Sequence, residues 1–274
     1  MRSIVFVGGG NMANAIISGL LKQGLPASAL HVVEPNETRR AKLRQELGVR
    51  CLPNADPSLA DGDLVVWAVK PQSFLAAAAP CGGILKNALH LSVMAGIRSN
   101  AIARAVGTRR VVRAMPNTPA LIGQGIAGLY AAPEVTATER AWVQDVLAAT
   151  GATLWVEREA DLDAVTALSG SGPAYVFYFV EAMVQAAQEM GLSAGQGRAL
   201  ALATFAGATA LAQASSEPVS TLRERVTSKG GTTHAALLSL EANAVKAAFV
   251  TALKAAQHRA RELGDEFGQT TPSG

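Results

Sequence analysis

Short apolar runs alternate with longer, more polar segments over the first 160 residues of the chain. The runs are rich in β-branched residues, as in RSIVFV at residues 2–7 and DLVVWAV at residues 63–69. Continuous apolar runs of this length are typical of strands buried on both faces of a parallel sheet. Strands are therefore expected at residues 2–7, 30–34, 49–52, 63–69, 89–94 and 110–114, with 126–130 and 153–156 as additions at the sheet edge.

Helix-forming segments separate these runs. Residues 11–23 place small side chains on one face, and residues 36–47 form a polar helix that ends at Gly48. Further helices are expected at residues 72–79, 99–106 and 136–149, the last with Thr136 as its N-cap. Strands that alternate with helices predict a mostly parallel, doubly wound α/β sheet.

The pattern changes near residue 160, and no further strand is expected beyond it. Ser171 could cap a helix whose first position is Pro173, where proline is tolerated. Helices are expected at residues 173–190, 194–214, 219–226, 232–241 and 244–265. The sequence thus predicts two domains, an α/β domain over residues 1–160 and an all-helical domain over residues 161–274.

The composition fits a protein with a sizeable core and a helical interface. Apolar residues make up 49% of the 274 positions and charged residues only 16%, and alanine is concentrated in the second half. Small residues at this density favour close helix packing and a subunit interface. The net charge of +3 is spread along the chain without a long basic run, so no nucleic-acid-binding arm is expected. The pairs Arg39-Arg40 and Arg109-Arg110 are expected to be solvated.

The sequence does not predict a metal-binding, membrane or secreted protein. Cys51 and Cys81 lack metal-ligand spacing, so both are interpreted as buried or half-buried thiols of a reducing compartment. No uncharged run of about eighteen apolar residues is present, and Glu181 and Glu189 interrupt the nearest approach to one. The first expected strand begins at Arg2, so the sequence predicts no signal peptide and a cytoplasmic protein.

The first strand leads into VGGGNMA, a G-x-G-x-x-A pattern at Gly8, Gly10 and Ala13. The first glycine makes a tight turn, the second lets the backbone approach a pyrophosphate, and the alanine lets the helix lie close to the strand. Because the motif follows a strand and opens a helix, it predicts a Rossmann-type dinucleotide site. Gly8, Gly10, Asn11 and Met12 are the expected cofactor contacts, and the alternative is a tight strand–helix turn without a ligand.

The end of the second strand bears on the choice between NAD and NADP. Glu34 is placed where a carboxylate would bond the ribose 2′-hydroxyl, which favours NAD because a 2′-phosphate would be repelled. Asn36, Arg39 and Arg40 follow directly, and an arginine there could bind a phosphate. Solvated arginines on a helix face are the alternative, so the sequence leaves NADH and NADPH open.

Three more loops are expected at the carboxyl ends of strands, where ligands bind in a doubly wound sheet. They are AVKP after the fourth expected strand, Ala95-Gly96 after the fifth, and MPNTP after the sixth. A structural loop on the sheet rim is the alternative for each. The expected cofactor contacts in these loops are Ala68, Val69, Lys70, Pro71, Ala95, Gly96 and Asn117.

The stretch VTSKGGTTHAALLSLE joins hydroxyl residues and a glycine pair to a helix-period run. Glycines let backbone N–H groups turn toward a ligand, and the following helix adds free N–H groups and its positive dipole end. The stretch therefore predicts a small anion site with hydroxyls beside it. His234 is the only one of the four histidines next to this loop. The residues expected to form the site are Ser228, Gly230, Gly231, Thr232 and Thr233.

Taken together, these motifs resemble the pyrroline-5-carboxylate reductase family over essentially the whole chain. The matching pieces are VGGGNMA, AVKP, RAMPNTPAL, DAVTALSGSGPAY and VTSKGGTTHAAL. The resemblance implies a Rossmann domain followed by an all-helical dimerisation domain, and dimers that gather into larger rings. It implies reduction of 1-pyrroline-5-carboxylate to L-proline with NADPH or NADH, with a slight preference for NADPH. One departure is Lys229, which stands where many relatives have proline.

The family's site residues carry over by position. The resemblance implies that the loop from Ser228 to Thr233 holds the substrate carboxylate and that Thr233 contacts the ring nitrogen. It implies that Asn54 and Lys70 line the cofactor, and that Glu159 and Arg225 are on the substrate side. Two other readings stay open: another imine or β-hydroxyacid reductase of the same plan, and a nucleotide-sensing module without catalysis. The first usually carries a lysine in a long interdomain helix, and residues 173–190 contain none.

Overall fold

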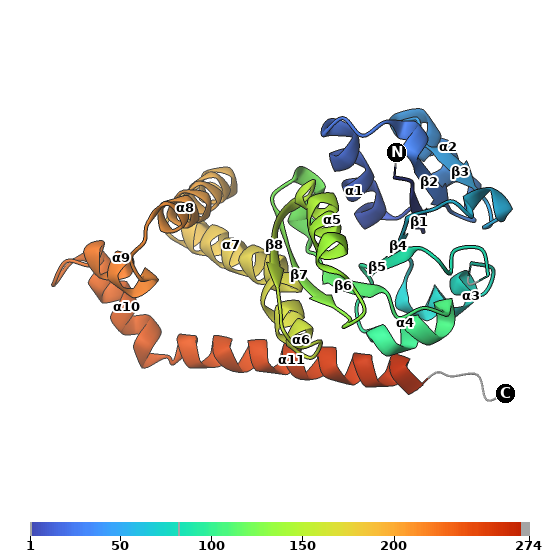
Figure 1. The fold of residues 1–274 in the computed structure, drawn as a ribbon. Helices are drawn as coiled ribbons and strands as arrows, with labels where there is room; N and C mark the ends of the chain where they lie inside the picture. The colour runs from blue at the N-terminus through green and yellow to red at the C-terminus, as the bar shows by residue number, and fades with distance from the viewer. Residues whose placement is uncertain (1, 82, 270–274) are drawn as a thin grey trace. The chain divides into compact units, whose positions relative to one another are not determined.

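The structure, a computed structural model, describes residues 2–81 and 83–269 (Figure 1). The chain divides into two compact units. One comprises the chain up to Ser171 together with the part that follows Ala255, and the other is Gly172–Ala255. The described secondary structure after residue 160 is entirely helical, as expected.

An eight-stranded sheet forms the centre of the first unit. Its order is β3-β2-β1-β4-β5-β6-β7-β8, and every neighbouring pair is parallel except β6 with β7. The mostly parallel, doubly wound α/β fold is thereby confirmed, with the last two strands at one edge. The strands are β1 (Ile4–Val7), β2 (Leu30–Val33), β3 (Arg50–Leu52), β4 (Leu64–Trp67), β5 (Leu89–Ser92), β6 (Val111–Met115), β7 (Gly125–Ala131) and β8 (Gly151–Trp155).

Helices cover both faces of this sheet because its strands are apolar on both sides. In β1, Ile4 and Phe6 belong to one buried cluster, and Val5 and Val7 belong to the other. The first cluster includes side chains of α1, α2 and α5, and the second includes side chains of α3 and α4. These helices are α1 (Asn11–Lys22), α2 (Glu37–Leu47), α3 (Phe74–Ala78), α4 (Ser99–Val106) and α5 (Ala137–Ala148).

Helix ends follow the expected capping chemistry. Thr136 accepts a hydrogen bond from the backbone N–H of Glu139, whose carboxylate bonds back to Thr136, so the predicted N-cap is confirmed as a full capping box. Gly48 ends α2 in the left-handed conformation, with φ of 67°. The Ser193 side chain caps α8 (Ala194–Ala214) in the same reciprocal way with Gln196.

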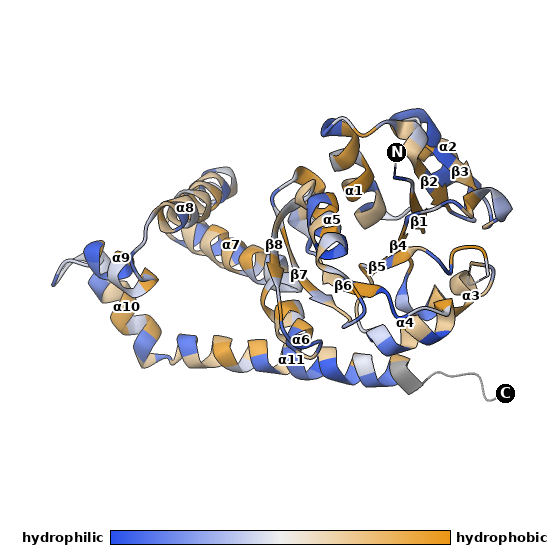
Figure 2. Cartoon of the chain, viewed as in Figure 1, coloured by the Kyte–Doolittle hydropathy of each residue, from blue (hydrophilic) through white to orange (hydrophobic). Residues whose placement is uncertain are grey.

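The remaining helices follow Ala160, and those within Gly172–Ala255 form the second unit. Apolar residues are distributed along α7 and α10 (Figure 2). The helices are α6 (Asp161–Val165), a π-helix (Thr166–Gly170), α7 (Gly172–Glu189), α8 (Ala194–Ala214), α9 (Val219–Arg225), α10 (Thr232–Ala242) and α11 (Val245–Gln269).

The structure corrects the expectation that Ser171 is an N-cap. Its backbone is helical, with φ of −84° and ψ of −17°, whereas an N-cap is extended. The N–H of Ser171 donates to the Thr166 carbonyl at 2.8 Å, so it closes the π-helix that precedes α7. Helical backbone therefore runs from Asp161 into α7, and no capped start separates the two.

The boundary between the two compact units lies between Ser171 and Gly172, later in the chain than residue 160. Leu162 and Ala167 are buried, and a Cβ on Gly128 of β7 would lie 2.6 Å from Val165. Residues 161–171 therefore pack on the sheet rather than with the helices that follow. The end of α11 also joins the first unit, where Phe267 packs against the second buried cluster.

Two features of the described residues bear on cysteine chemistry and membranes. Cys51 and Cys81 are free thiols, half-buried and buried, as expected. Within residues 2–81 and 83–269, no single helix has the length and apolar character to cross a membrane. One bent pair, Thr232–Ala242 with Val245–Phe267, meets those criteria by length and composition.

Candidate cofactor site and substrate loop

The glycine turn after β1 allows two close approaches, one at Gly8 and one at Gly9. Gly8 has a φ of 100°, and a Cβ there would lie 2.7 Å from the Ala68 carbonyl oxygen. A Cβ on Gly9 would lie 2.7 Å from Leu43. In contrast, a Cβ on Gly10 would meet nothing within 4 Å. Gly8 and Gly9 are thus required by packing, and Gly10 leaves open space at the start of α1.

Helix α1 begins at this open space without a side-chain cap. Gly10 is its N-cap residue, and no side chain within residues 2–81 and 83–269 bonds the first amides. The first N–H groups of a helix have no partner within the helix, and they carry its positive dipole end. A phosphate at this end of α1 would satisfy both features.

A cavity of about 670 Å³ lies over the glycine turn and the start of α1. The carboxyl ends of β1, β2 and β4 contribute to its wall, as expected for a ligand site in a doubly wound sheet. Its lining residues are Gly8, Gly9, Gly10, Asn11, Asn14, Glu34, Pro35, Arg39, Lys42, Leu43, Ala68, Val69, Lys70 and Ser73.

Half of the predicted cofactor contacts line this cavity. They are Gly8, Gly10, Asn11, Glu34, Ala68, Val69 and Lys70. The other seven do not line it: Met12, Asn36, Asn54, Pro71, Ala95, Gly96 and Asn117. Sequence reasoning missed Asn14, Lys42 and Ser73. Lys42 and Asn14 lie on α2 and α1 one turn beyond the motif residues, a helical spacing that could have indicated them.

Some of the remaining predicted contacts have partners inside the protein. The side-chain oxygen of Asn117 accepts a hydrogen bond from the Ile126 N–H at 3.0 Å, which closes the loop between β6 and β7. Asn36 caps α2 by accepting from the Arg39 N–H at 2.9 Å. A Cβ on Gly96, whose φ is 76°, would lie 3.0 Å from Phe267, so the glycine allows the end of α11 to pack there.

Glu34 is buried at the end of β2, and its side chain is 5% exposed. One carboxylate oxygen accepts from the Gly9 N–H at 3.0 Å, and the other accepts from the Asn36 N–H at 2.9 Å. The guanidinium of Arg39 lies 3.7 Å from the first of these oxygens. The carboxylate therefore joins the glycine turn to the start of α2.

The two neighbouring arginines of α2 have different environments. Arg40 is buried, contrary to the expectation of a solvated pair, because its guanidinium donates to the Glu34 carbonyl at 2.7 Å and pairs with Glu37. The Arg39 side chain is 60% exposed and lines the cavity. Only one arginine of the pair is therefore free to meet a ligand.

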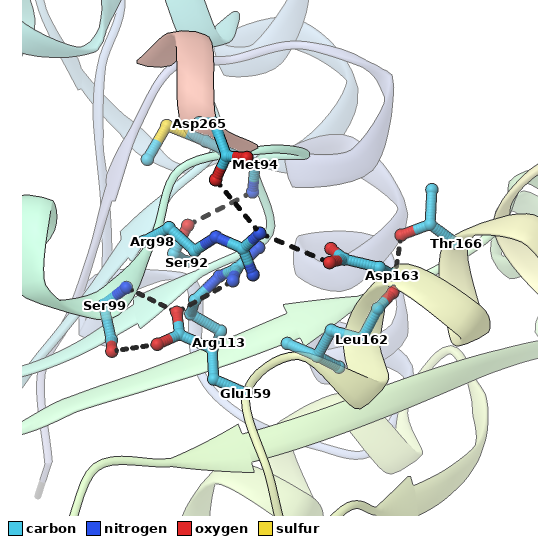
Figure 3. A network of polar contacts seen from close by, with 10 residues as sticks. All are labelled: Ser92, Met94, Arg98, Ser99, Arg113, Glu159, Leu162, Asp163, Thr166 and Asp265. Atoms are coloured by element: carbon cyan, nitrogen blue, oxygen red, sulfur yellow. Dashed lines mark hydrogen bonds and ion pairs between the residues drawn. The ribbon is translucent and has the colours of Figure 1, made fainter. Parts of the chain in front are cut away.

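A polar network surrounds Glu159 and includes Ser99 at the start of α4 and Arg113 of β6 (Figure 3). Its carboxylate accepts from the Ser99 N–H at 2.6 Å, from the Ser99 hydroxyl at 2.7 Å and from Arg113 at 2.8 Å. Next to this group, Arg98 contacts Asp163 at 3.3 Å and Asp265 at 3.8 Å. The network ties α4, β6, α6 and the end of α11 together within the first unit.

The charges in this network set its pKa values. Burial would raise the pKa of Glu159, but Arg113 and the Ser99 hydrogen bonds outweigh burial and hold that pKa below its ordinary value. Burial lowers the pKa of Arg113, and Glu159 opposes that shift. Glu159 is thus a carboxylate at neutral pH that is engaged in internal hydrogen bonds.

The second unit carries the predicted anion loop at the start of α10. Gly230 has a φ of 77°, and the Gly231 N–H donates to the Ser228 carbonyl at 3.0 Å. Gly231 is the N-cap residue of α10, and no side chain in the described part of the chain caps the helix. The free amides at the start of this helix are therefore available to an anion.

The hydroxyls of this loop are also available. Among the described residues, none is hydrogen-bonded to the side chain of Thr232 or Thr233, and Thr233 is half-buried. Arg225, in contrast, pairs with Glu217 at 2.6 Å. The loop residues thus offer amides and hydroxyls for a ligand, and Arg225 is held by its neighbour.

Comparison with known proteins gives two family matches. Residues 3–96 match the model described as "NADP oxidoreductase coenzyme F420-dependent". Residues 159–263 match "Pyrroline-5-carboxylate reductase dimerisation". The first match covers the glycine turn and β4, and the second covers α6 through most of α11.

Relatives match over nearly the full length. The pyrroline-5-carboxylate reductase of Pseudomonas aeruginosa is 42% identical, with 97% of this chain and 98% of the relative covered. The solved structure of the Coxiella burnetii pyrroline-5-carboxylate reductase has a TM-score of 0.90 at 34% identity, covering 96% of this chain and 98% of that one. A Plasmodium falciparum pyrroline carboxylate reductase with NADP bound has a TM-score of 0.84 at 28% identity, covering 96% and 98%.

The doubly wound sheet, its glycine turn and these matches define the class of the protein as an NAD(P)H-dependent oxidoreductase. The helical part and the full-length relatives narrow this class. The chain belongs to the pyrroline-5-carboxylate reductase family.

Proposed function

We propose that the chain reduces 1-pyrroline-5-carboxylate to L-proline by hydride transfer from NAD(P)H, the final step of proline biosynthesis. The observation that carries this proposal is the uncapped, glycine-led start of α10 with its free hydroxyls, in a chain that also holds a dinucleotide-type cavity. A generic dinucleotide-binding protein has no need of a second anion loop. The full-length relatives named pyrroline-5-carboxylate reductase support the same reaction.

The cavity of the first unit fits the cofactor. Gly10 leaves room where a pyrophosphate would approach, and the amides of Asn11 and Met12 at the start of α1 would bind its charge. Lys70 lines the same cavity and adds a positive charge. When bound, the reduced cofactor supplies the hydride. Asn54, Pro71, Ala95, Gly96 and Asn117 remain proposed contacts outside the cavity wall.

The loop that starts α10 would hold the substrate. Its backbone amides at Gly230 and Thr232 would bind the carboxylate, with the Ser228 hydroxyl beside them. The Gly231 amide would join them by releasing the Ser228 carbonyl, to which it donates at 3.0 Å. The Thr233 hydroxyl would orient the ring nitrogen. Because the carboxylate is bonded directly to a ring carbon, amides that hold the carboxylate also limit where the ring can lie.

The reaction needs a hydride at the imine carbon and a proton at the imine nitrogen. The C=N double bond becomes a C–N single bond, and the cofactor gives up the two electrons. If the imine binds already protonated, the chain needs no dedicated acid, and its task is to position the substrate in a dry site. His234 follows Thr233 in α10 and is the histidine proposed as a proton donor.

We propose that Glu159 and Arg225 lie on the substrate side of the site and influence the substrate through the residues that they bind. Glu159 bonds Ser99 and Arg113, and Arg225 pairs with Glu217. Each would shape the site by holding adjacent backbone in place. A direct contact with the substrate would require these partners to be exchanged.

Assembly belongs to the same proposal. The match to the dimerisation model supports a homodimer formed through residues 159–263, and we extend it to a larger assembly of dimers. A cytoplasmic location fits the free thiols of Cys51 and Cys81.

A substrate panel with the purified protein tests the function. We expect oxidation of NADPH or NADH on addition of 1-pyrroline-5-carboxylate, and none on addition of an open-chain imine or the 3-oxo acid that a β-hydroxyacid reductase would accept. Faster turnover of either of those compounds would favour the rival reductase. Cofactor binding without turnover of any compound would favour the nucleotide-sensing module.

A further inference from the structure

The ribose end of the cofactor cavity carries opposite charges whose roles the sequence leaves open. Glu34, Arg39 and Lys42 all line it, and a carboxylate at the end of the second strand ordinarily bonds the 2′-hydroxyl of NAD. We propose that Glu34 is instead an internal clamp of the glycine turn, and that Arg39 and Lys42 recognise a 2′-phosphate, so that the chain selects NADPH over NADH. This inference rests on the proposed use of NAD(P)H.

The hydrogen bonds of Glu34 assign it the clamp role. Both carboxylate oxygens already accept backbone N–H groups, from Gly9 at 3.0 Å and from Asn36 at 2.9 Å. The side chain is only 5% exposed, so it presents little of its charge to the cavity. A carboxylate that fixes the turn and the start of α2 is retained for the fold, whichever cofactor binds.

The charges that reach the cavity are mainly positive. The side chains of Arg39 and Lys42 are 60% and 65% exposed, in contrast to that of Glu34. Lys70 adds a third positive charge to the wall, against the single carboxylate. A 2′-phosphate carries up to two negative charges, so this mainly positive wall attracts it more strongly than it attracts a neutral 2′-hydroxyl.

The geometry of α2 also separates the two arginines. Arg40 is withdrawn into the protein, with its guanidinium on the Glu34 carbonyl and on Glu37. Arg39 lies 3.7 Å from Glu34, at the limit of an ion pair, and keeps most of its donors free. Lys42 follows Arg39 by three residues, so both side chains lie on the same face of α2. Among the described residues, the one acidic side chain within ion-pair distance of Lys42 is the exposed Glu46, at 3.9 Å.

Binding of 2′,5′-ADP and of 5′-AMP, measured by calorimetry on the full chain, tests this assignment without any turnover. The two probes differ only by the 2′-phosphate. We expect 2′,5′-ADP to bind more tightly. Arg39→Ala should weaken 2′,5′-ADP about 10- to 100-fold and leave 5′-AMP within about twofold, because a charged hydrogen bond to phosphate is lost. Lys42→Ala should act in the same direction by about 3- to 10-fold.

Two further variants complete the design. Arg44→Ala removes a positive charge from the same helix, where Arg44 pairs with Glu37 outside the cavity, and should leave both probes unchanged. Glu34→Gln should weaken both probes together, because one amide of the clamp loses its acceptor. Thermal melts confirm that each variant is folded.

Tighter binding of 5′-AMP by the unaltered chain would overturn the proposal. So would equal losses for both probes in Arg39→Ala. A Glu34→Gln variant that binds 2′,5′-ADP more tightly while losing 5′-AMP would assign Glu34 the ribose role instead. Selective binding of 2′,5′-ADP in a chain that fails to reduce 1-pyrroline-5-carboxylate would leave this inference standing and reject the proposed reaction.

Discussion

At the scale of single residues, Thr233 combines a free hydroxyl with a position at the start of α10. If this hydroxyl orients the imine nitrogen, Thr233→Ala should lower kcat/KM about 10- to 100-fold, the effect of one lost hydrogen bond to a charged group. Thr233→Ser should recover most of the activity. Steady-state kinetics on both variants provide the measurement.

The matched control for Thr233 is Thr251→Ala. Thr251 lies within α11, and its hydroxyl bonds only the Ala247 carbonyl at 3.0 Å. The two alanine variants should melt at similar temperatures. Full activity in a folded Thr233→Ala variant would remove Thr233 from the mechanism.

His90 is the residue whose titration should dominate the acid stability of the first unit. Trp67 donates to its Nδ1 at 3.0 Å, and its Nε2 lies 3.2 Å from the Leu85 carbonyl. Burial lowers the pKa of His90 to about 4. The unfolded chain therefore binds a proton more readily between pH 4 and 6.5, and the free energy of unfolding should fall by roughly 3 kcal/mol as the pH drops through that window.

Urea unfolding at a series of pH values checks this slope. His90→Gln keeps an acceptor for Trp67 and a donor for Leu85 but cannot titrate, so its unfolding free energy should change less between pH 4 and 6.5. His258→Gln, which alters an exposed histidine of α11, is the control for the substitution itself. An unchanged slope in His90→Gln would contradict the assignment.

Residue roles could be predicted from the sequence only where a motif fixes the backbone. The glycine turn and Lys70 were predicted and do line the cavity. The difference between Arg39 and Arg40 could not be predicted, because adjacent helix positions point 100° apart and only the packed structure shows which direction is the core. The clamp role of Glu34 depends on the Gly9 N–H, 25 positions away.

At the scale of elements, the β1–α1 turn depends on two separate properties of Gly8. Its φ of 100° is unfavourable for other residues, and a Cβ would also approach Ala68. Gly24, which follows α1, has a similar φ of 91° but open space around it. A comparison of Gly8 with Gly24 therefore separates the cost of a positive φ from the cost of crowding by a Cβ.

Alanine at these two glycines should therefore have unequal effects. Gly24→Ala should cost about 1–2 kcal/mol of unfolding free energy with nucleotide binding intact. Gly8→Ala should cost about 1–3 kcal/mol more, because the turn must move away from the Ala68 carbonyl, and it should abolish nucleotide binding. Denaturant unfolding and calorimetry measure both effects, and equal behaviour of the two variants would refute the role of crowding.

Most elements could be predicted because apolar periodicity differs between buried strands and covering helices. All eight expected strands are present, including the two at the sheet edge. The continuous helical path from Asp161 into α7 was missed because serine and glycine at residues 169–172 are typical of a helix start. In the structure Gly170 packs closely instead, since a Cβ there would lie 2.6 Å from the Met115 side chain.

At the scale of the whole molecule, the second unit exposes many large apolar side chains that a stable monomer would bury. Phe177, Tyr178 and Met190 are 59%, 69% and 74% exposed. Patches of this kind indicate an interface. They lie within the residues that match the dimerisation model.

An acidic substitution on this surface should therefore disrupt assembly. Phe177→Glu should shift sedimentation from a dimer or larger species toward a monomer and lower activity with it. Leu75→Glu, which alters an exposed leucine of the first unit outside the cavity, should leave sedimentation unchanged. A Phe177→Glu variant that sediments like the unaltered protein would place the interface elsewhere.

The sequence alone could not predict how the chain divides into compact units. A composition change near residue 160 marks the end of the strands, whereas the packing of Leu162 and Ala167 on the sheet depends on distant partners. The return of α11 to the first unit depends on contacts of Gly264 with Arg98 that are far apart in sequence.

The most direct test of the account follows the hydride itself. The full-length protein is supplied with 1-pyrroline-5-carboxylate and with NADPH that carries deuterium on one face of the nicotinamide ring, and the proline formed is analysed by mass spectrometry. The two faces of the ring are labelled in separate samples of NADPH. We expect one of the two samples, and not the other, to give proline with one deuterium at Cδ, the ring carbon next to nitrogen that does not carry the carboxylate. Proline without deuterium from either face, or no proline at all, would contradict the account.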